Sequence, residues 1–338
     1  TDNISAAWNV QVVLAGSSLN AGMRVEDIHG RIDLKGDFDG KQTSLLGRLD
    51  LDSVSVLRHE TGVPHQVTRV AGPFRLREGE LTAGSREIVL PPQDPNKYPA
   101  RIPPAERITG DAIDGKLTLD AVADVRAEVI YRANLTLSQG RLERYAQQYL
   151  RGQTDLAGIM NGWLNLSGRG ESADQIRGRG KLLIEPAALY QLPLFVQMFR
   201  ALRLDPSARA AFERASLDFN IENSRFNFET IDLIGDAISF KGRGVVKFDG
   251  AMQLDFYSML ARDQVRFPII HEIAKRLSQG WVGVKVTGHV GYPQTTIIPV
   301  PEFDDAVKQF LGSIDSVQPS LMKTGSSNGS KQPPTETR

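Results

Sequence analysis

The five histidines of this chain can be tested for metal-binding spacing. Two histidines four residues apart on a helix can hold a zinc ion, but no pair here has that spacing. His271 and Glu272 begin such a pattern, and Lys275 then stands where the second histidine would be needed. We therefore predict no metal site.

One pair of acidic residues, Asp50 and Asp52, has the spacing that places two side chains on the same face of a strand. Glycoside hydrolysis uses two carboxylates, so this pair is compatible with a carbohydrate-active β-helix enzyme. No second acidic cluster supports that hypothesis, and we rank it last. We predict no catalytic residues, no cofactor and no enzymatic activity.

Three Gly-Arg-Gly triplets, at residues 168–170, 178–180 and 242–244, are typical of one class of RNA-binding segment. Proteins that hold single-stranded nucleic acid interleave aromatic side chains with basic ones, and these triplets lack the aromatic residues. The chain has 40 Lys and Arg against 40 Asp and Glu, so it carries no basic excess to neutralise phosphates. We interpret the triplets as glycines at strand ends and turns, and predict that the protein binds no nucleic acid.

The composition is that of a folded protein with a buried core, since 41% of the 338 residues are hydrophobic and 24% are charged. The absence of cysteine excludes disulfides and thiolate metal sites. No run of 18 apolar residues occurs, so we expect no helix of this chain to span a bilayer. The chain starts at Thr1 without Met and reads as a strand from Trp8, so we expect a targeting or anchoring segment upstream.

Apolar and polar residues alternate with a period of two along much of the chain. In the segment 217–222, Leu217, Phe219 and Ile221 are separated by polar residues, and the same pattern recurs at 252–257. Alternation places the apolar side chains on one face of a strand, which is typical of half-buried antiparallel sheets. Dipeptides such as Asp114-Gly115, Asn161-Gly162 and Asp249-Gly250 indicate hairpin turns. The fold class predicted is mainly β: a long, curved antiparallel sheet, shaped either as an open groove or like a taco, with a few short helices.

Four short helices are predicted, at 141–150, 192–204, about 268–277 and about 302–314, each with apolar residues at helical spacing. The segment 91–104 holds six prolines and is predicted to be a long loop, since proline is excluded from central strands. From residue 318 onward the chain is rich in Ser, Gly, Pro and Lys, and we predict a disordered tail at 318–338.

Between residues 160 and 260, several short motifs follow one another in a specific order. A Gly-x-Gly strand, Gly178-Arg179-Gly180, is followed by Tyr190-Gln191-Leu192-Pro193, a short apolar helix and a series of alternating strands. This order resembles the C-terminal region of AsmA-like proteins, bacterial envelope proteins related to bridge-like lipid transfer proteins. The resemblance is clear over residues 141–300 and only stylistic over 1–140, so we divide the chain into 1–140, 141–317 and the tail 318–338.

The resemblance implies a periplasmic protein that is anchored in the inner membrane by a segment absent from this chain. It also implies a long curved sheet with an apolar inner face, and a role in phospholipid movement and maintenance of the outer membrane. Members of the family have no established catalytic residues to carry over.

We accordingly predict that the protein binds or conducts phospholipid or another membrane lipid along an apolar groove. Burial of each methylene group of an acyl chain yields about 0.8 kcal/mol, so such a groove could hold lipid. The alternative is a structural or scaffolding envelope protein whose sheet face is a filled core. The residues predicted to line the groove are Leu217, Phe219, Ile221, Ile238, Phe240, Val246, Phe248, Met252, Leu254 and Phe256.

Overall fold

A computed structural model of the chain describes residues 5–20, 24–38, 42–58, 64–84, 88–90, 100–102, 106–150, 155–170, 172–202, 212–235, 238–260 and 281–298. The helices predicted at 268–277 and 302–314 and the tail predicted at 318–338 lie outside these residues, as does most of the loop predicted at 91–104.

The described residues contain eighteen strands, two α-helices and a 3-10 helix at Ala173–Gln175. The α-helices are α1 (Leu142–Tyr149) and α2 (Pro193–Ala201). The strands are β1 (Ala6–Asn20), β2 (Arg24–Phe38), β3 (Thr43–Arg58), β4 (Pro64–Arg77), β5 (Glu80–Ala83), β6 (Ile88–Leu90), β7 (Ala100–Ile102), β8 (Ile108–Ala112), β9 (Gly115–Asp124), β10 (Ile130–Arg141), β11 (Ala157–Arg169), β12 (Arg177–Ala188), β13 (Arg214–Glu222), β14 (Arg225–Ile234), β15 (Ile238–Lys247), β16 (Ala251–Leu260), β17 (Trp281–His289) and β18 (Tyr292–Ile298).

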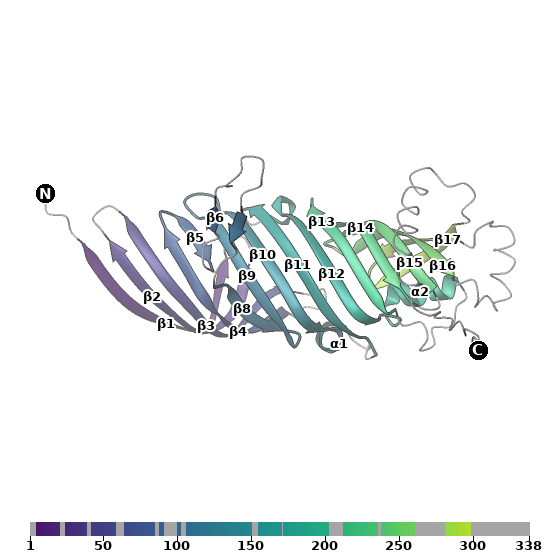
Figure 1. The fold of residues 1–338 in the computed structure, drawn as a ribbon, viewed down its shortest axis with the longest axis horizontal. Coiled ribbons are helices and arrows are strands. Elements are labelled where there is room, and N and C mark those ends of the chain that lie inside the picture. The colour runs from purple at the N-terminus through teal and green to yellow at the C-terminus, as the bar shows by residue number, and fades with distance from the viewer. Residues whose placement is uncertain are drawn as a thin grey trace, which may run out of the picture. The chain divides into compact units, whose positions relative to one another are not determined.

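Sixteen of these strands form one antiparallel sheet in which nearly every strand lies beside its neighbours in sequence (Figure 1). Its order runs β1-β2-β3-β4-β5, then β9 to β18 in sequence, while β8 pairs with both β4 and β9. Strands β6 and β7 pair with each other in a separate two-stranded sheet. The predicted fold class, mainly β with a long antiparallel sheet and few short helices, is confirmed.

Two of the three predicted hairpin turns are present in the structure. Asp114-Gly115 lies at the β8–β9 hairpin and Asp249-Gly250 at the β15–β16 hairpin. Asn161-Gly162 was predicted to be a turn and instead lies inside β11, where Gly162 pairs with Leu137 and Leu182 on the two flanking strands. An Asn-Gly pair marks a turn only when the strands on either side fold back on each other, and here both flanks continue as one strand.

Bulges interrupt strands β1, β2 and β4 at matching levels of the sheet. Gly16 in β1, Asp27 in β2 and Arg69 in β4 all have positive φ angles, of 74°, 51° and 50°. Register shifts accompany them between β1 and β2, between β2 and β3, and between β4 and β8. Because a bulge bends its strand and increases local twist, the aligned bulges bend this part of the sheet along a line.

Both described helices agree with the predicted segments, although α2 is shorter than predicted. Helix α2 lies in a 25-residue insertion between β12 and β13, whose ends are joined by the backbone pairing of Ala187 with Phe212. Two other predictions need correction. Strand β7 lies within the segment predicted to be a loop, outside the main sheet. The Gly-Arg-Gly triplets at 178–180 and 242–244 lie within β12 and β15, where glycine on one face receives aromatic rings from the next strand.

The main sheet continues without interruption through residue 140, because β10 spans Ile130–Arg141 and pairs with both β9 and β11. Residues 1–298 form one compact unit. A large apolar core lies between α1, α2 and strands β11–β17, and a smaller one around Ile28, Leu51 and Val70 lies on β2–β4. The two sequence regions divided at residue 140 thus contribute to the same sheet.

Candidate functional site: one apolar face of the sheet

One face of the main sheet carries an unbroken row of apolar residues, one from each of fifteen consecutive strands. Each member is the direct cross-strand partner of the next, and directly paired residues lie on the same face. The row is Val10, Leu34, Gly47, Phe74, Ala83, Ala121, Ala133, Leu166, Gly178, Ile221, Phe226, Val246, Met252, Gly288 and Pro293. At about 4.8 Å between strands it is roughly 67 Å long, measured across the strands.

The neighbouring row on the opposite face contains mostly polar residues. It passes through Asn9, Lys35, Leu46, Arg75, Thr82, Val122, Arg132, Ser167 and Arg177. Cross-strand ion pairs lie on this face, including Arg31 with Asp50 and Lys181 with Asp218. Asp50, the first member of the acidic pair noted in the sequence, is therefore engaged by an arginine. The two faces of the sheet differ in chemistry along most of its length.

Aromatic rings on the apolar face lie over glycines of the adjacent strand. Five such cross-strand pairs occur among the described residues: Trp8 with Gly36, Phe74 with Gly47, Tyr131 with Gly168, Phe219 with Gly180 and Phe256 with Gly242. A Cβ atom built on any of these glycines would lie between 2.1 and 2.5 Å from an atom of the ring. The glycines thus let large rings lie close to the backbone, which limits how far they project from the face.

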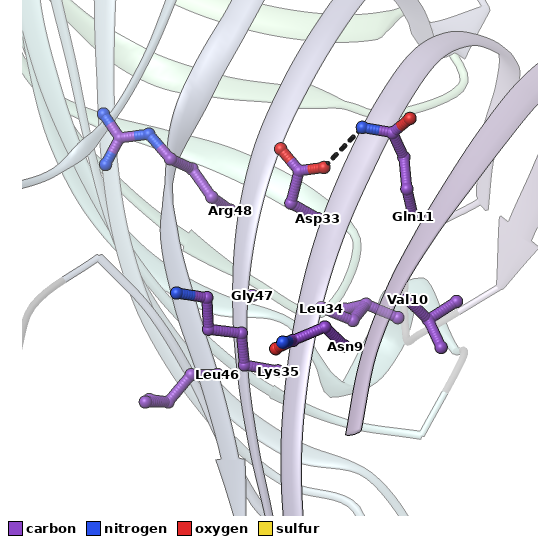
Figure 2. Close-up of a pocket in the computed structure, with 9 residues that line it drawn as sticks. All are labelled: Asn9, Val10, Gln11, Asp33, Leu34, Lys35, Leu46, Gly47 and Arg48. Carbon is purple, nitrogen blue, oxygen red and sulfur yellow. Dashed lines mark hydrogen bonds between the residues drawn. The ribbon is translucent and has the colours of Figure 1, made fainter. Parts of the chain in front are cut away.

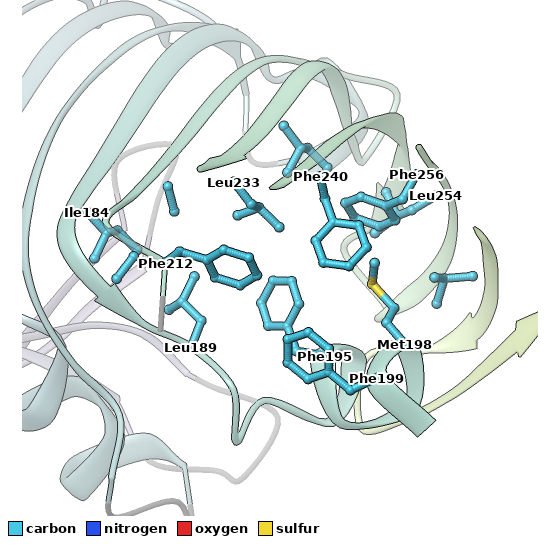
Figure 3. Close-up of a cluster of buried hydrophobic side chains, with 14 of the residues drawn as sticks. Ile184, Leu189, Phe195, Met198, Phe199, Phe212, Leu233, Phe240, Leu254 and Phe256 are labelled. Carbon is cyan, nitrogen blue, oxygen red and sulfur yellow. The ribbon is translucent and has the colours of Figure 1, made fainter. Parts of the chain in front are cut away.

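Helix α2 covers the C-terminal section of this face. Its side chains Phe195, Met198 and Phe199 point into the curve of the sheet (Figure 3) and are at most 4% exposed. The Phe199 ring centroid lies 6.2 Å from that of Phe240, which lies 6.4 Å from that of Phe256. We call the residues beneath the helix the capped section: Ile238, Phe240, Met252, Leu254, Phe256, Val284 and Val286.

The middle of the face is less covered. Apolar side chains of strands β9, β10, β11 and β13 are only half-buried although they lie on the same face as the capped section. Leu119 pairs with Leu135, which pairs with Leu164, and Leu164 is followed across the sheet by Gly180 and Phe219. We call this set the open strip: Leu119, Leu135, Leu164, Leu166, Leu217 and Phe219. Leu119 at one end of the strip also packs against the smaller core around Leu51 and Ile108, and the other members leave part of their apolar surface uncovered.

The ten residues predicted to line a groove differ in how far they are buried in the structure. Nine lie in strands on the apolar face, and Phe248 follows β15 at its edge, 39% exposed, with its ring 5.2 Å from that of Phe226. Leu217, Phe219 and Val246 are half-buried. Ile221 is buried, and Ile238, Phe240, Met252, Leu254 and Phe256 are buried in the capped section. These last five are part of the filled core that also includes α2, whose Phe199 packs against Phe240.

The open strip was largely missed by the sequence reading. Leu135 alternates with polar residues as Leu254 does, so the signal was available in the segment 133–137, whereas Trp163 beside Leu164 blurs it in the segment 162–166. Alternation identifies a face but does not tell which part of that face another element covers. Only the position of α2 separates the capped section from the open strip.

An open hollow of about 630 Å³ lies over strands β1–β3 (Figure 2). Its polar lining comes from two cross-strand rows, Asn9 with Lys35 and Gln11 with Asp33 and Arg48. Gln11 Nε2 donates a hydrogen bond of 2.8 Å to Asp33 Oδ1. Val10, Leu34 and Gly47 of the apolar row also line the hollow, and all of its lining residues belong to β1–β3, so it is separate from the open strip on the later strands.

Asp232 and Asp111, two of the carboxyl groups on the polar face, have shifted pKa values. Burial raises the pKa of Asp232, and the Nζ of its cross-strand partner Lys241, 3.9 Å away, counteracts part of that rise. A hydrogen bond from Arg69 lowers the pKa of Asp111, and Lys116, with its Nζ 3.5 Å away, lowers it further. Both carboxyl groups have a basic partner on a neighbouring strand, but the ion pair sets the direction of the pKa shift only at Asp111, since burial dominates at Asp232.

The segment Gly110–Lys116 has the glycine and lysine spacing of a phosphate-binding loop, but Leu117 stands where such loops have Ser or Thr. In the structure it is the β8–β9 hairpin, with Ile113 and Asp114 at positive φ angles in the turn. Phosphate loops require a helix N-terminus after the glycines, and none follows here. The segment has no phosphate-binding geometry.

Within the described ranges, no three His, Asp or Glu side chains gather as metal ligands, and no helix has the length and apolar character needed to cross a membrane. Comparison of the chain with family models, with curated proteins and with solved structures found no match.

Proposed function

We propose that the chain holds the acyl chains of a membrane lipid, such as a phospholipid, on the open strip. It would act in the periplasm as part of an AsmA-like envelope protein that is anchored to the inner membrane and supports maintenance of the outer membrane. The observation that carries the proposal is the unbroken apolar row, which includes half-buried side chains where α2 does not cover the sheet. We propose no catalytic role for any residue.

The physical chemistry of the strip favours lipid as its occupant. A soluble β protein commonly has one apolar face, but that face is normally buried against another layer. Leaving leucines such as Leu135 and Leu164 half in water forgoes part of the roughly 25 cal/mol gained per Å² of apolar surface buried. An acyl chain that lies across the strands could cover that surface over several strands and would itself be removed from water.

A purely structural role is the second candidate, and the capped section favours it. There the same apolar face is filled by α2, with Met198 and Phe199 fully buried. If the whole face served only as core, bound lipid would be absent and apolar contacts would come from protein alone. The two candidates differ in what they predict for the open strip.

Lipid bound to purified protein distinguishes these functions. The protein would be incubated with vesicles of phosphatidylethanolamine and phosphatidylglycerol, separated from them, and its lipid counted by native mass spectrometry. We expect bound phospholipid on the wild-type chain. Leu164→Asp should reduce it roughly tenfold while the protein stays folded, because a carboxylate placed in the strip opposes an acyl chain but can still reach water.

The matched control is Asn165→Asp, since Asn165 is the next residue on β11 and lies exposed on the polar face. It introduces the same side chain on the opposite side of the sheet and should leave bound lipid unchanged. A folded wild-type chain that takes up no lipid would support the structural role instead.

A further inference from the structure

Helix α2 is held against the sheet by contacts on several sides. Phe195 packs against Phe212 with ring centroids 5.5 Å apart, and Phe199 against Phe240. On the other side, Thr295 Oγ1 of β18 donates a hydrogen bond of 3.3 Å to the backbone oxygen of Gln197. The insertion that carries the helix is joined at its base by two backbone hydrogen bonds between Ala187 and Phe212, of 2.8 and 3.1 Å.

Moving the helix away would expose its three buried side chains and the floor beneath them. Because Phe195, Met198 and Phe199 would be exposed to water, the form with the helix displaced would make up roughly one molecule in a thousand or fewer at equilibrium. An acyl chain could shift this equilibrium only by refilling the same volume, and the core there has side chains at 0–7% exposure. The contacts therefore describe a permanently filled region and not a lid.

We propose that α2 is a fixed stop that ends the lipid path at the C-terminal side of the sheet. Acyl chains then occupy the open strip, and do not pass over Phe240, Leu254 and Phe256. This inference rests on the proposed lipid function and specifies where on the face the lipid lies. If α2 is such a stop, the lipid path is closed at the end that α2 covers. Lipid would then enter and leave elsewhere along the open strip.

A disulfide that locks the helix to the sheet tests this directly, because the chain has no cysteine of its own. Gln197→Cys combined with Thr295→Cys would join α2 to β18. Phosphatidylglycerol with a diazirine in one acyl chain would be photolysed with the oxidised and the reduced protein, and the adducts mapped by mass spectrometry. We expect equal lipid labelling of both forms within roughly twofold, with adducts on the open strip.

Loss of labelling in the oxidised form alone would overturn the inference, since it would mean that lipid requires α2 to move. Adducts on Phe240, Leu254 or Phe256 in the wild-type chain would overturn it independently of whether the disulfide forms. If the folded wild-type chain is not labelled anywhere, the proposed lipid function is wrong. The inference that α2 ends the lipid path is then wrong as well.

Discussion

At the scale of single residues, Gly180 and Phe219 face each other across β12 and β13. Alanine normally stabilises a strand relative to glycine by about 0.5–1 kcal/mol. Here a Cβ atom would lie 2.5 Å from Phe219 Cζ, so Gly180→Ala should instead lower the free energy of unfolding by about 1–3 kcal/mol. Urea denaturation followed by circular dichroism would measure the change.

Two variants test the cause of that loss. Gly291→Ala is the matched control, because a Cβ atom there meets nothing nearer than 3.7 Å. Adding Phe219→Leu to Gly180→Ala should recover part of the loss, since it removes the ring that clashes. If Gly180→Ala and Gly291→Ala unfold at the same urea concentration as the wild type, the rings do not depend on the glycines.

The ion pair of Asp111 with Arg69 gives stability a defined pH dependence. The folded-state pKa of Asp111 lies below its ordinary value of 3.8, so the stabilisation is present above about pH 4 and is lost as the pH falls through the folded pKa. Asp111→Asn should cost about 1 kcal/mol at neutral pH, a modest figure because Arg69 is 81% exposed. The difference from wild type should disappear in acid.

Asp124 is the comparison for this prediction. Its pKa is lowered to about 2 by a hydrogen bond from Arg126, two residues along the chain. Because so local a contact can also form in the unfolded chain, Asp124→Asn should change stability less than Asp111→Asn. A larger effect of Asp124→Asn in thermal melts across this pH range would contradict that reasoning.

At the scale of elements, α2 is predicted to carry much of the stability of the C-terminal core. Phe199→Ala removes a fully buried ring and should cost about 3–5 kcal/mol. Arg200→Ala, on the exposed side of the same helix, should change stability by no more than about 0.5 kcal/mol. Equal unfolding midpoints for the two variants would show that the helix is not part of the core.

A charge introduced beneath α2 should affect stability differently from a charge introduced on the open strip. Phe240→Asp should unfold the C-terminal core, because an unpaired buried charge costs several kcal/mol. Leu164→Asp should leave the protein folded, with its melting temperature close to that of wild type. A folded Phe240→Asp variant would mean that water already reaches the capped section.

Elements of this protein could be predicted from sequence to different degrees. Period-two alternation in 217–222 and 252–257 gave the strands and their apolar face, and apolar residues at helical spacing gave α1 and α2. The cover on Phe240 could not be predicted, since it comes from Phe199 of α2, which is a neighbour neither in sequence nor in the sheet. The alignment of the bulges at Gly16 and Asp27 could not be predicted either, because it depends on the register between strands.

At the scale of the whole sheet, the apolar row from Val10 to Pro293 joins segments that are far apart in sequence into one surface. It does so because consecutive strands pair in sequence order and the register keeps apolar residues opposite one another. Val10 at the start of the row is 46% exposed, whereas Met252 in the capped section is 7% exposed. We therefore expect the lipid-accessible part of this surface to lie before the strands covered by α2.

The central claim is that acyl chains touch the open strip and not the polar face. A photoreactive p-benzoylphenylalanine at the position of Leu164, or at that of Asn165, tests it on two adjacent residues of β11. Illumination with vesicles of phosphatidylethanolamine and phosphatidylglycerol should give a phospholipid adduct from the position of Leu164 and essentially none from that of Asn165. Equal adducts from both positions, or an adduct from Asn165 alone, would contradict the claim.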